Sequence, residues 1–327
     1  MGSELGALII SLDFELHWGV RDWSEANGPY RANLLGVRDA VPRILEQFQE
    51  FDIAATWATV GFLFARTQRE LVESWPALRP RYRDSRLDPY HEPVGAAEAD
   101  DPIHYAPSLL TAIRETPRQE IGTQTYSHYY CLEPGQDRET FRADIESATA
   151  IARTRGITIR SIVFPRNQHN PAYDDILVKA GITCYRGNQD AWMYRATGGS
   201  GQTRVKRVAR LADAYLSVGD RTFGWHDVAG QGPLTNVPAS FFVRPCGARE
   251  GALDRLHFRR LTESMRRAAT ERRILHLWWH PENFGRDVAP NARRLRDLLG
   301  VFAECRDRYA MQSLSMADAA AIAGAAG

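Results

Sequence analysis

The chain has 327 residues, 44% of them hydrophobic and 25% charged, which is enough to bury a sizeable core as a single globular domain over residues 1–327. The formal net charge of +1 argues against nucleic acid or an anionic membrane as the main partner, because both usually select a basic face. No apolar run reaches the roughly 20 residues of a membrane span and the N-terminus lacks the pattern of a secretion signal, so we expect a cytoplasmic protein with no membrane span.

The sequence alternates between apolar runs typical of buried strands and longer stretches whose apolar residues have helical spacing. We expect strands at residues 7–12, 53–60, 120–125, 159–164, 182–185, 274–279 and 309–314. We expect helices at residues 33–50, 62–75, 109–114, 138–155, 172–180, 205–216, 256–270 and 291–306, followed by an alanine-rich helix that closes the chain. Strands that alternate with helices predict a parallel sheet.

Four stretches rich in polar, glycine or proline residues interrupt the alternation of strands and helices: 18–30, 76–107, 198–201 and 218–237. Segment 76–107 is too long for an ordinary connection, and loops of that length often cover a site. About seven strand-helix units favour a closed or nearly closed α/β barrel, whose chemistry lies at the carboxyl ends of the strands. An open doubly wound sheet is the alternative, but the chain has no glycine-rich nucleotide-binding motif.

Acidic residues and a histidine follow directly on the first strand. Asp13, Glu15 and His17 alternate at period two, so an extended chain sends all three side chains to one face. Such groups at the carboxyl end of a buried strand are poor for stability and suited to metal or proton chemistry. The alternative from this stretch alone is a capped loop with solvated charges.

Three later strands lead to reactive side chains in the same way. Gln124 lies at the end of the third expected strand and His128 follows it, Arg166 follows the fourth strand, and His280 follows the sixth. The carboxyl ends of parallel strands share one rim of a barrel. We therefore expect these residues to converge with those after the first strand.

The segments Ser11–Glu15, Glu120–His128 and Leu275–Pro281 resemble the first, second and fifth motifs of the polysaccharide deacetylases, the NodB-homology carbohydrate esterases. The similarity extends over most of the chain, from residue 7 to the last strand. It implies a distorted (β/α)7 barrel with long irregular insertions over the carboxyl ends of the strands. It also implies a hydrolase that removes an acyl group from an N-acylated amino sugar. That hydrolase would use one divalent metal ion, zinc first, with cobalt, nickel, manganese or iron as alternatives.

The resemblance also assigns roles to individual residues. Asp13 would be the general base that takes a proton from the attacking water, and His280 would protonate the leaving amine. Asp190, in a segment similar to the fourth motif, would orient His280. Glu15 and His128 would be metal ligands, and a metal polarises the amide carbonyl so that a weakly reactive amide becomes hydrolysable.

Two positions depart from the family pattern. Gln124 stands where the family has the first histidine of its HxxxH segment, and an amide oxygen binds borderline metals less well than imidazole. His17 is the candidate to replace that ligand, and the alternatives are a harder metal held weakly or no metal. The arginine of the third motif is also missing, because Val163 occupies its position, and we expect Arg166 to reach Asp13 by another route.

Aromatic and imidazole side chains near the predicted rim are candidates for substrate contacts. These are Trp18, His104, Tyr129, Tyr130 and Trp192. Aromatic rings can stack against a sugar, although the same residues can also simply fill the rim. The expected substrate is a small, nucleotide-linked or lipid-linked amino sugar.

The sequence thus predicts a cytoplasmic, metal-dependent amidohydrolase of a glycan or natural-product pathway. One alternative is a homologue that has lost its metal and binds a carbohydrate or a protein partner without turnover. The other is an enzyme of the same fold that acts on a non-sugar amide or a formamide.

Overall fold

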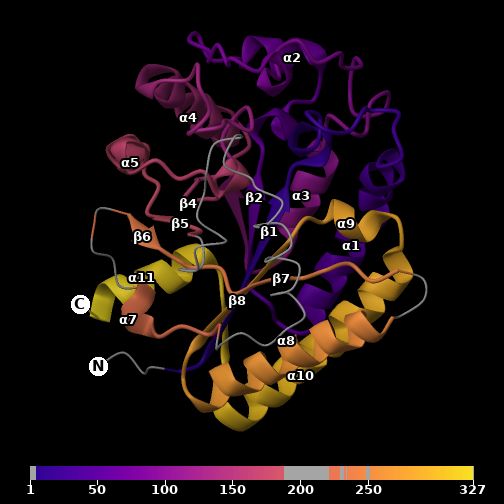
Figure 1. Ribbon diagram of the computed structural model, residues 1–327, viewed down its shortest axis with the longest axis vertical. Coiled ribbons are helices and arrows are strands. Elements are labelled where there is room, and N and C mark those ends of the chain that lie inside the picture. The colour runs from indigo at the N-terminus through magenta and orange to yellow at the C-terminus, as the bar shows by residue number, and fades with distance from the viewer. Residues whose placement is uncertain (1–4, 188–220, 229–231, 233, 248–250, 327) are drawn as a thin grey trace.

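The computed structural model describes residues 5–187, 221–228, 232, 234–247 and 251–326. At its centre lies one sheet whose named strands all pair in parallel. The strands are β1 (Ala7–Phe14), β2 (Ala55–Thr59), β3 (Gln119–Thr123), β4 (Ser161–Ile162), β5 (Cys184–Tyr185), β6 (Thr235–Asn236), β7 (Phe241–Phe242), β8 (Ile274–Trp279) and β9 (Gln312–Leu314). Their order is β6-β5-β4-β3-β2-β1-β8-β7, and β9 pairs with β1 beside this row. The sheet curls into a partial barrel, which confirms the predicted distorted α/β barrel (Figure 1).

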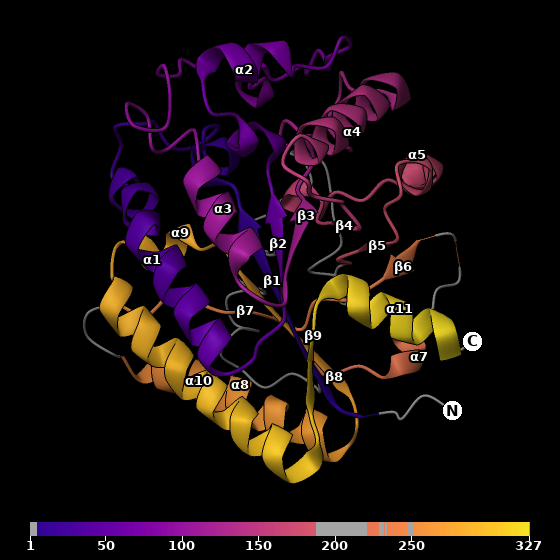
Figure 2. The same cartoon turned by 180° about the vertical axis from the view of Figure 1, so that it is seen from behind.

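Helices surround the sheet. They are α1 (Arg31–Glu50), α2 (Gln68–Glu73), α3 (Pro107–Glu115), α4 (Arg138–Arg153), α5 (Asp174–Lys179), α7 (Trp225–Val228), α8 (Ala252–Thr270), α9 (Glu282–Gly285), α10 (Val288–Tyr309) and α11 (Met316–Ala326). Helix α1 packs against α3, α9 and α10, and α10 packs against α8; Figure 2 shows α1, α3 and α10 together in front of the strands. None of the described helices has the length and apolar character needed to cross a membrane.

The first strand shows how the sequence pattern builds the barrel. Leu8, Ile10, Leu12 and Phe14 point outward into the main apolar core beneath the helices. Ala7 and Ile9, on the other face, belong to a second apolar cluster. Side chains alternate across a strand, so Ser11 and Asp13 share the inner face with Ala7 and Ile9. Every side chain of β1 is buried, as expected for a parallel strand covered on both faces.

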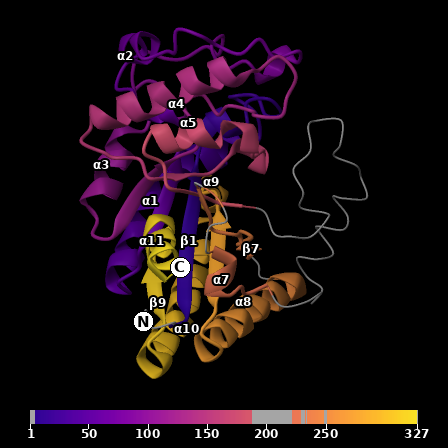
Figure 3. The same ribbon diagram turned by 90° about the vertical axis from the view of Figure 1, so that its left-hand side faces the viewer.

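Helix α11 closes the amino end of the barrel. Its Met316 and three alanines pack in the same cluster as Ala7 and Ile9, and the helix lies beside β1 and β9 in Figure 3. The buried carboxylate of Glu120 accepts hydrogen bonds from Thr56 at 2.7 Å and from the backbone N–H of Ala317 at 3.3 Å. A carboxylate stabilises the positive N-terminal end of a helix. Only the carboxyl end of the barrel therefore remains for chemistry.

The expected helix at 62–75 is wrong in part, because the structure divides it. A single 3-10 turn covers Gly61–Phe64, and α2 begins only at Gln68. Between them the backbone is extended at Ala65 and Thr67, and the Thr67 hydroxyl caps α2 by accepting from the N–H of Glu70 at 3.2 Å.

At the end of the chain, helix α10 extends into the start of the expected strand 309–314. It stops where Ala310 adopts a left-handed conformation with φ of 56°, so β9 is shorter than predicted. Strands β6 and β7 and the short helix α7 are not predicted by the sequence, and β6 and α7 fall in segment 218–237, where irregular structure is expected. The expected helix 205–216 and the glycine segment 198–201 lie outside the described residues.

Candidate active site

Asp13, near the end of β1, is held by a buried arginine. Arg186, the residue after β5, donates from Nη1 to Oδ1 at 2.5 Å and from Nη2 to Oδ2 at 2.7 Å. Both side chains are buried, and two charge-assisted hydrogen bonds in a planar fork are strong and directional. The guanidinium also lies 4.3 Å from the centre of the Trp278 ring. The pair fixes the orientation of the Asp13 carboxylate and compensates its charge.

Ser11 connects this ion pair to β8. Arg186 Nη1 donates to Ser11 Oγ at 3.0 Å, and His276 Nε2 lies 2.9 Å from the same oxygen. The other ring nitrogen of His276, Nδ1, is 3.0 Å from the carbonyl oxygen of Pro238. A carbonyl only accepts, so Nδ1 carries the hydrogen and Nε2 accepts from the Ser11 hydroxyl. Burial lowers the pKa of His276 to about 3, which keeps the ring neutral.

This neutral histidine predicts how stability depends on pH. The unfolded chain protonates at its ordinary pKa near 6.5, and the folded chain does so only near 3, so stability falls as pH falls through that window. The expected slope from this group is about 1.4 kcal/mol per pH unit. In urea unfolding between pH 7 and 4.5, His276→Gln should show a shallower loss of stability than the parent chain. The exposed His91→Gln should leave the slope unchanged, and equal slopes in all three proteins would contradict the assignment.

Glu15 Oε1 lies among three nitrogen-bearing side chains. Gln124 Nε2 donates to it, His128 Nε2 is 3.5 Å away, and His280 Nε2 is 3.7 Å away. His280 Nε2 is also 3.9 Å from Asp13 Oδ2, so the structure brings all five side chains together at one rim. Burial raises the pKa of Glu15 to about 7, with His280 opposing the rise and Asp13 adding to it. A bound cation would offset the free-energy cost of burying this negative charge.

Two features outside the motifs hold Glu15 in place. The buried carboxylate of Glu282, in α9, accepts the backbone N–H of Glu15 at 3.1 Å and that of Leu16. These bonds fix the turn in which Leu16 takes a positive φ of 50°. Gly19 lies against the Glu15 side chain so closely that a Cβ would overlap it, so any larger residue at position 19 would displace the Glu15 carboxylate.

The loop after β3 carries His128 and is anchored from below by α4. Asp144, fully buried, accepts the backbone N–H of Tyr126 at 2.7 Å and of Ser127 at 3.1 Å. His128 has a left-handed backbone with φ of 57°, and its Nδ1 lies 3.1 Å from the Tyr130 hydroxyl. A ring fixed at one nitrogen presents the other in a defined direction.

The donor set fits one divalent metal ion. Glu15 contributes a carboxylate oxygen, and burial lowers the pKa of His128 to about 3, so its ring is neutral as a metal ligand must be. Gln124 Oε1 is buried and has no hydrogen-bond partner among the described residues. Exchanging the amide oxygen and nitrogen of Gln124, which a half-turn of the group achieves, directs that oxygen toward Glu15. Carboxylate, imidazole and amide oxygen then face one point.

The prediction that Arg166 reaches Asp13 is wrong. Arg166 has a positive φ of 53° in the turn after β4, which directs its side chain outward to an ion pair with Asp22. Its guanidinium also lies 4.5 Å from the centre of the Tyr130 ring. Arg186 takes the place beside Asp13 instead.

His17 is not beside Glu15, so the prediction that it completes the same ligand set is wrong. The extended chain ends before it, because residues Leu16–Gly19 form a 3-10 turn. The turn carries His17 away to a separate group with Glu92 and His104. His104, predicted to contact substrate, is buried in that group.

The predicted stacking residues are also buried. The Tyr129 hydroxyl bonds to Thr140 at 2.7 Å, Tyr130 lies beneath Arg166, and Trp18 donates to the backbone oxygen of His104 at 2.9 Å. All three are at most 1% exposed, so their rings offer no face to a sugar and the prediction is wrong for them. Asp190 and Trp192 lie outside the described residues.

The sequence reasoning missed two functional positions, Arg186 and Glu282. Arg186 directly follows the expected strand 182–185, so the strand-end rule applied to that strand would have found it. Glu282 lies two residues after His280, and nothing in its sequence context shows that it turns back to the backbone of the first strand.

Residues 28–185 match the family model described as polysaccharide deacetylase. No curated protein matches this chain.

Several solved structures share the fold. A protein described as a polysaccharide deacetylase from Mycobacterium smegmatis aligns with a TM-score of 0.62 and 14% identity, over 98% of this chain and 91% of that one. Puue allantoinase aligns with a TM-score of 0.55 and 13% identity, over 99% and 92% of the two chains. A protein described as a polysaccharide deacetylase from Pseudomonas aeruginosa PAO1 aligns with a TM-score of 0.55 and 11% identity, over 97% of this chain and 89% of that one.

Proposed function

Because residues 28–185 match the polysaccharide deacetylase family model, we propose that the chain is a metal-dependent amidohydrolase that removes an N-acetyl or other N-acyl group from an amino sugar. The observation that carries this proposal is the gathering of Asp13, Glu15, Gln124, His128 and His280 at one buried rim. Costly charged groups collected in one place are typical of a catalytic site.

Glu15, His128 and Gln124 would hold the ion, for which zinc is the first candidate and cobalt, nickel, manganese and iron are the alternatives. When bound, the ion would polarise the scissile carbonyl and make water more acidic. The protein's part is to present one carboxylate, one neutral imidazole and one amide in fixed positions. Glu282, Gly19 and the loop after β3 provide that fixation.

Asp13 is the proposed general base. Arg186 donates a hydrogen bond to each oxygen of the Asp13 carboxylate, which fixes the orientation of that group. The permanently charged guanidinium also compensates the negative charge of Asp13. Asp13 Oδ2 lies 3.9 Å from His280 Nε2, so the proposed base and the proposed acid face the same space. A base already oriented and within reach of the reacting water requires little rearrangement.

His280 is the proposed general acid for the leaving amine. Its side chain is 29% exposed, the most open of the site residues, and Nε2 faces both acidic residues. The half-buried rings of Phe242 and Trp278 lie 5.9 and 5.8 Å from the imidazole, centre to centre. These two rings, at the mouth of the site, are the proposed surface for a sugar. Orientation of His280 by Asp190 stays a prediction.

The amino sugar is proposed to be a small, nucleotide-linked or lipid-linked one in a glycan or natural-product pathway. The cytoplasmic location stays a prediction from the sequence. One observation favours the alternative of a metal-deficient binding protein: Gln124 donates a hydrogen bond to Glu15, which satisfies that carboxylate without an ion. Hydrolysis of a non-sugar amide or a formamide is a further alternative.

The experiment measures acyl release and metal together. The purified chain, stripped with a chelator and reloaded with zinc, is assayed for acetate release from N-acetylated monosaccharides and nucleotide sugars. We expect release that depends on added metal and is lost in Glu15→Gln. The matched control is Glu25→Gln, an acid near the turn after β1 but outside the site. Full metal loading without release from any N-acyl sugar would contradict the amino-sugar proposal.

A further inference from the structure

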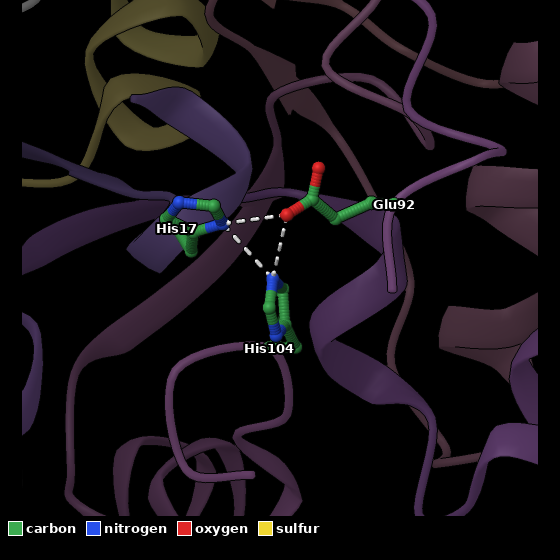
Figure 4. Close-up of side chains that lie close together, drawn as sticks. All are labelled: His17, Glu92 and His104. Carbon is green, nitrogen blue, oxygen red and sulfur yellow. Dashed lines mark hydrogen bonds and ion pairs between the residues drawn. The ribbon is translucent and has the colours of Figure 1, made fainter. Parts of the chain in front are cut away.

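A second group of potential ligands, His17, Glu92 and His104, lies apart from the proposed catalytic site. His17 belongs to the 3-10 turn after β1, and the other two come from the irregular segment between α2 and α3. His17 Nδ1 is 2.9 Å from His104 Nε2 and 3.4 Å from Glu92 Oε1, and His104 Nε2 is 3.7 Å from the same oxygen. Figure 4 shows the three side chains pointing toward one another. The group shares no residue with the cluster of Asp13, Glu15 and His280.

The outer nitrogen of each ring faces an acceptor. His17 Nε2 lies 3.1 Å from the backbone oxygen of Ser24, and His104 Nδ1 lies 2.7 Å from Asp101 Oδ2. A carbonyl and a carboxylate accept, so these outer nitrogens carry the hydrogens. In the neutral rings, the inner nitrogens then present lone pairs to each other at 2.9 Å, beside a carboxylate oxygen. Three electron-rich atoms at this separation repel one another unless a proton or a metal cation lies between them.

The spacing suits a small ion. For a triangle with these three sides, the point equidistant from the donor atoms lies about 1.95 Å from each, and bonds to zinc are about 2.0–2.2 Å long. An ion slightly out of the plane of the three atoms therefore reaches all of them without moving any. Two imidazoles and one carboxylate, with a fourth position for water, form a common zinc ligand set.

We propose that His17, Glu92 and His104 form a metal site for a zinc-like divalent ion, separate from the site at Glu15. The outer contacts to Ser24 and Asp101 are the partners that orient metal-bound histidines and raise their basicity. Both imidazoles are almost fully buried, and Trp18 packs edge-on against the His104 ring at 4.9 Å, so the ligands are preorganised. The Glu92 side chain is 21% exposed, so an ion can reach the three ligands from solvent on that side.

The ion at this site would join two distant parts of the chain. The turn after β1 begins at Leu16, next to Glu15, and the segment with Glu92 and His104 has little regular structure of its own. A metal that binds both is a cross-link present only in the folded state, so it stabilises the fold by mass action.

The test isolates this site with a background variant. His128→Asn removes a ligand of the catalytic site, and asparagine tolerates the left-handed backbone there. In this background, zinc is removed by chelation and returned by titration, with metal content, cobalt absorption spectra and thermal unfolding as readouts. We expect one equivalent of zinc, a tetrahedral cobalt spectrum and a rise in the unfolding temperature. Adding Glu92→Gln, an isosteric change at a part-exposed residue, should weaken zinc binding at least tenfold.

The control is His91→Gln, which removes an exposed histidine next to Glu92 and should change nothing. His104→Gln is the second test variant, in case Glu92→Gln retains weak binding through the two rings. Failure of the His128→Asn protein to bind zinc would overturn the proposal, as would equal zinc affinity with and without Glu92→Gln and His104→Gln. Neither result depends on turnover, so each is distinct from a failure of the proposed deacylase activity.

Discussion

Replacing Asp13 by asparagine is expected to lower kcat/KM for acyl release by about 10³-fold, because a positioned general base contributes on the order of 10²- to 10⁴-fold. Asparagine keeps the shape of the side chain but cannot accept the proton. Zinc binding should be retained, since the proposed ligands Glu15, Gln124 and His128 are unchanged. The measurement is acetate release at saturating zinc, together with the metal content of the same sample.

The substitution also leaves Arg186 opposite a neutral amide, and an uncompensated buried charge costs about 3–5 kcal/mol of stability. The assay must therefore run below the unfolding transition. The double variant Asp13→Asn, Arg186→Gln removes the unpaired charge and should recover stability without recovering turnover. Asp22→Asn, which also loses a carboxylate paired with an arginine, is the control for activity. Turnover retained in Asp13→Asn would remove Asp13 from its assigned role.

Replacing Gln124 by histidine is expected to tighten zinc binding at the catalytic site by at least about tenfold. Imidazole is a better ligand for zinc than an amide oxygen. The amide of Gln124 also donates its N–H to Glu15, so it competes with a cation for that carboxylate. In a zinc titration followed by metal content, Gln124→His should reach full loading at lower free zinc. Acetate release at limiting zinc should rise in parallel.

Gln119→His, at the start of the same strand and away from the rim, is the matched control and should leave the zinc affinity unchanged. Equal and full occupancy in the parent chain and in Gln124→His would show that position 124 is not a ligand. Tighter zinc binding without any acyl release, in either form, would instead favour the carbohydrate-binding alternative.

The residues at the rim of the barrel could be predicted from the sequence because two simple rules hold in the folded protein. Side chains alternate along β1, so Asp13 was placed on the inner face, and parallel strands end on one side, so His128 and His280 were placed near it. The same reasoning failed at His17, because it assumed an extended chain past Glu15. Leu16 has a positive φ, and this left-handed residue ends the extended chain, so His17 does not share the face of Asp13 and Glu15.

The arginine beside Asp13 could not be chosen from the motif alone. Arg166 stands closer to the family position, but the backbone turn at that residue decides its direction. Arg186 follows a strand of only two residues, which carries little sequence signal. The group of His17, Glu92 and His104 was beyond reach for another reason, since an irregular segment has no period from which side-chain directions follow.

The place of β1 in the sheet also sets the order in which this protein can fold. Its first residues pair with β8 and β9, and only its later residues pair with β2. During synthesis β1 must therefore wait for residues 274–314 to emerge before most of its backbone pairs can form. Contacts between such remote parts of a chain slow folding, and a ribosome-bound fragment without the last strands would expose the unpaired edge of β1 to aggregation or to chaperones.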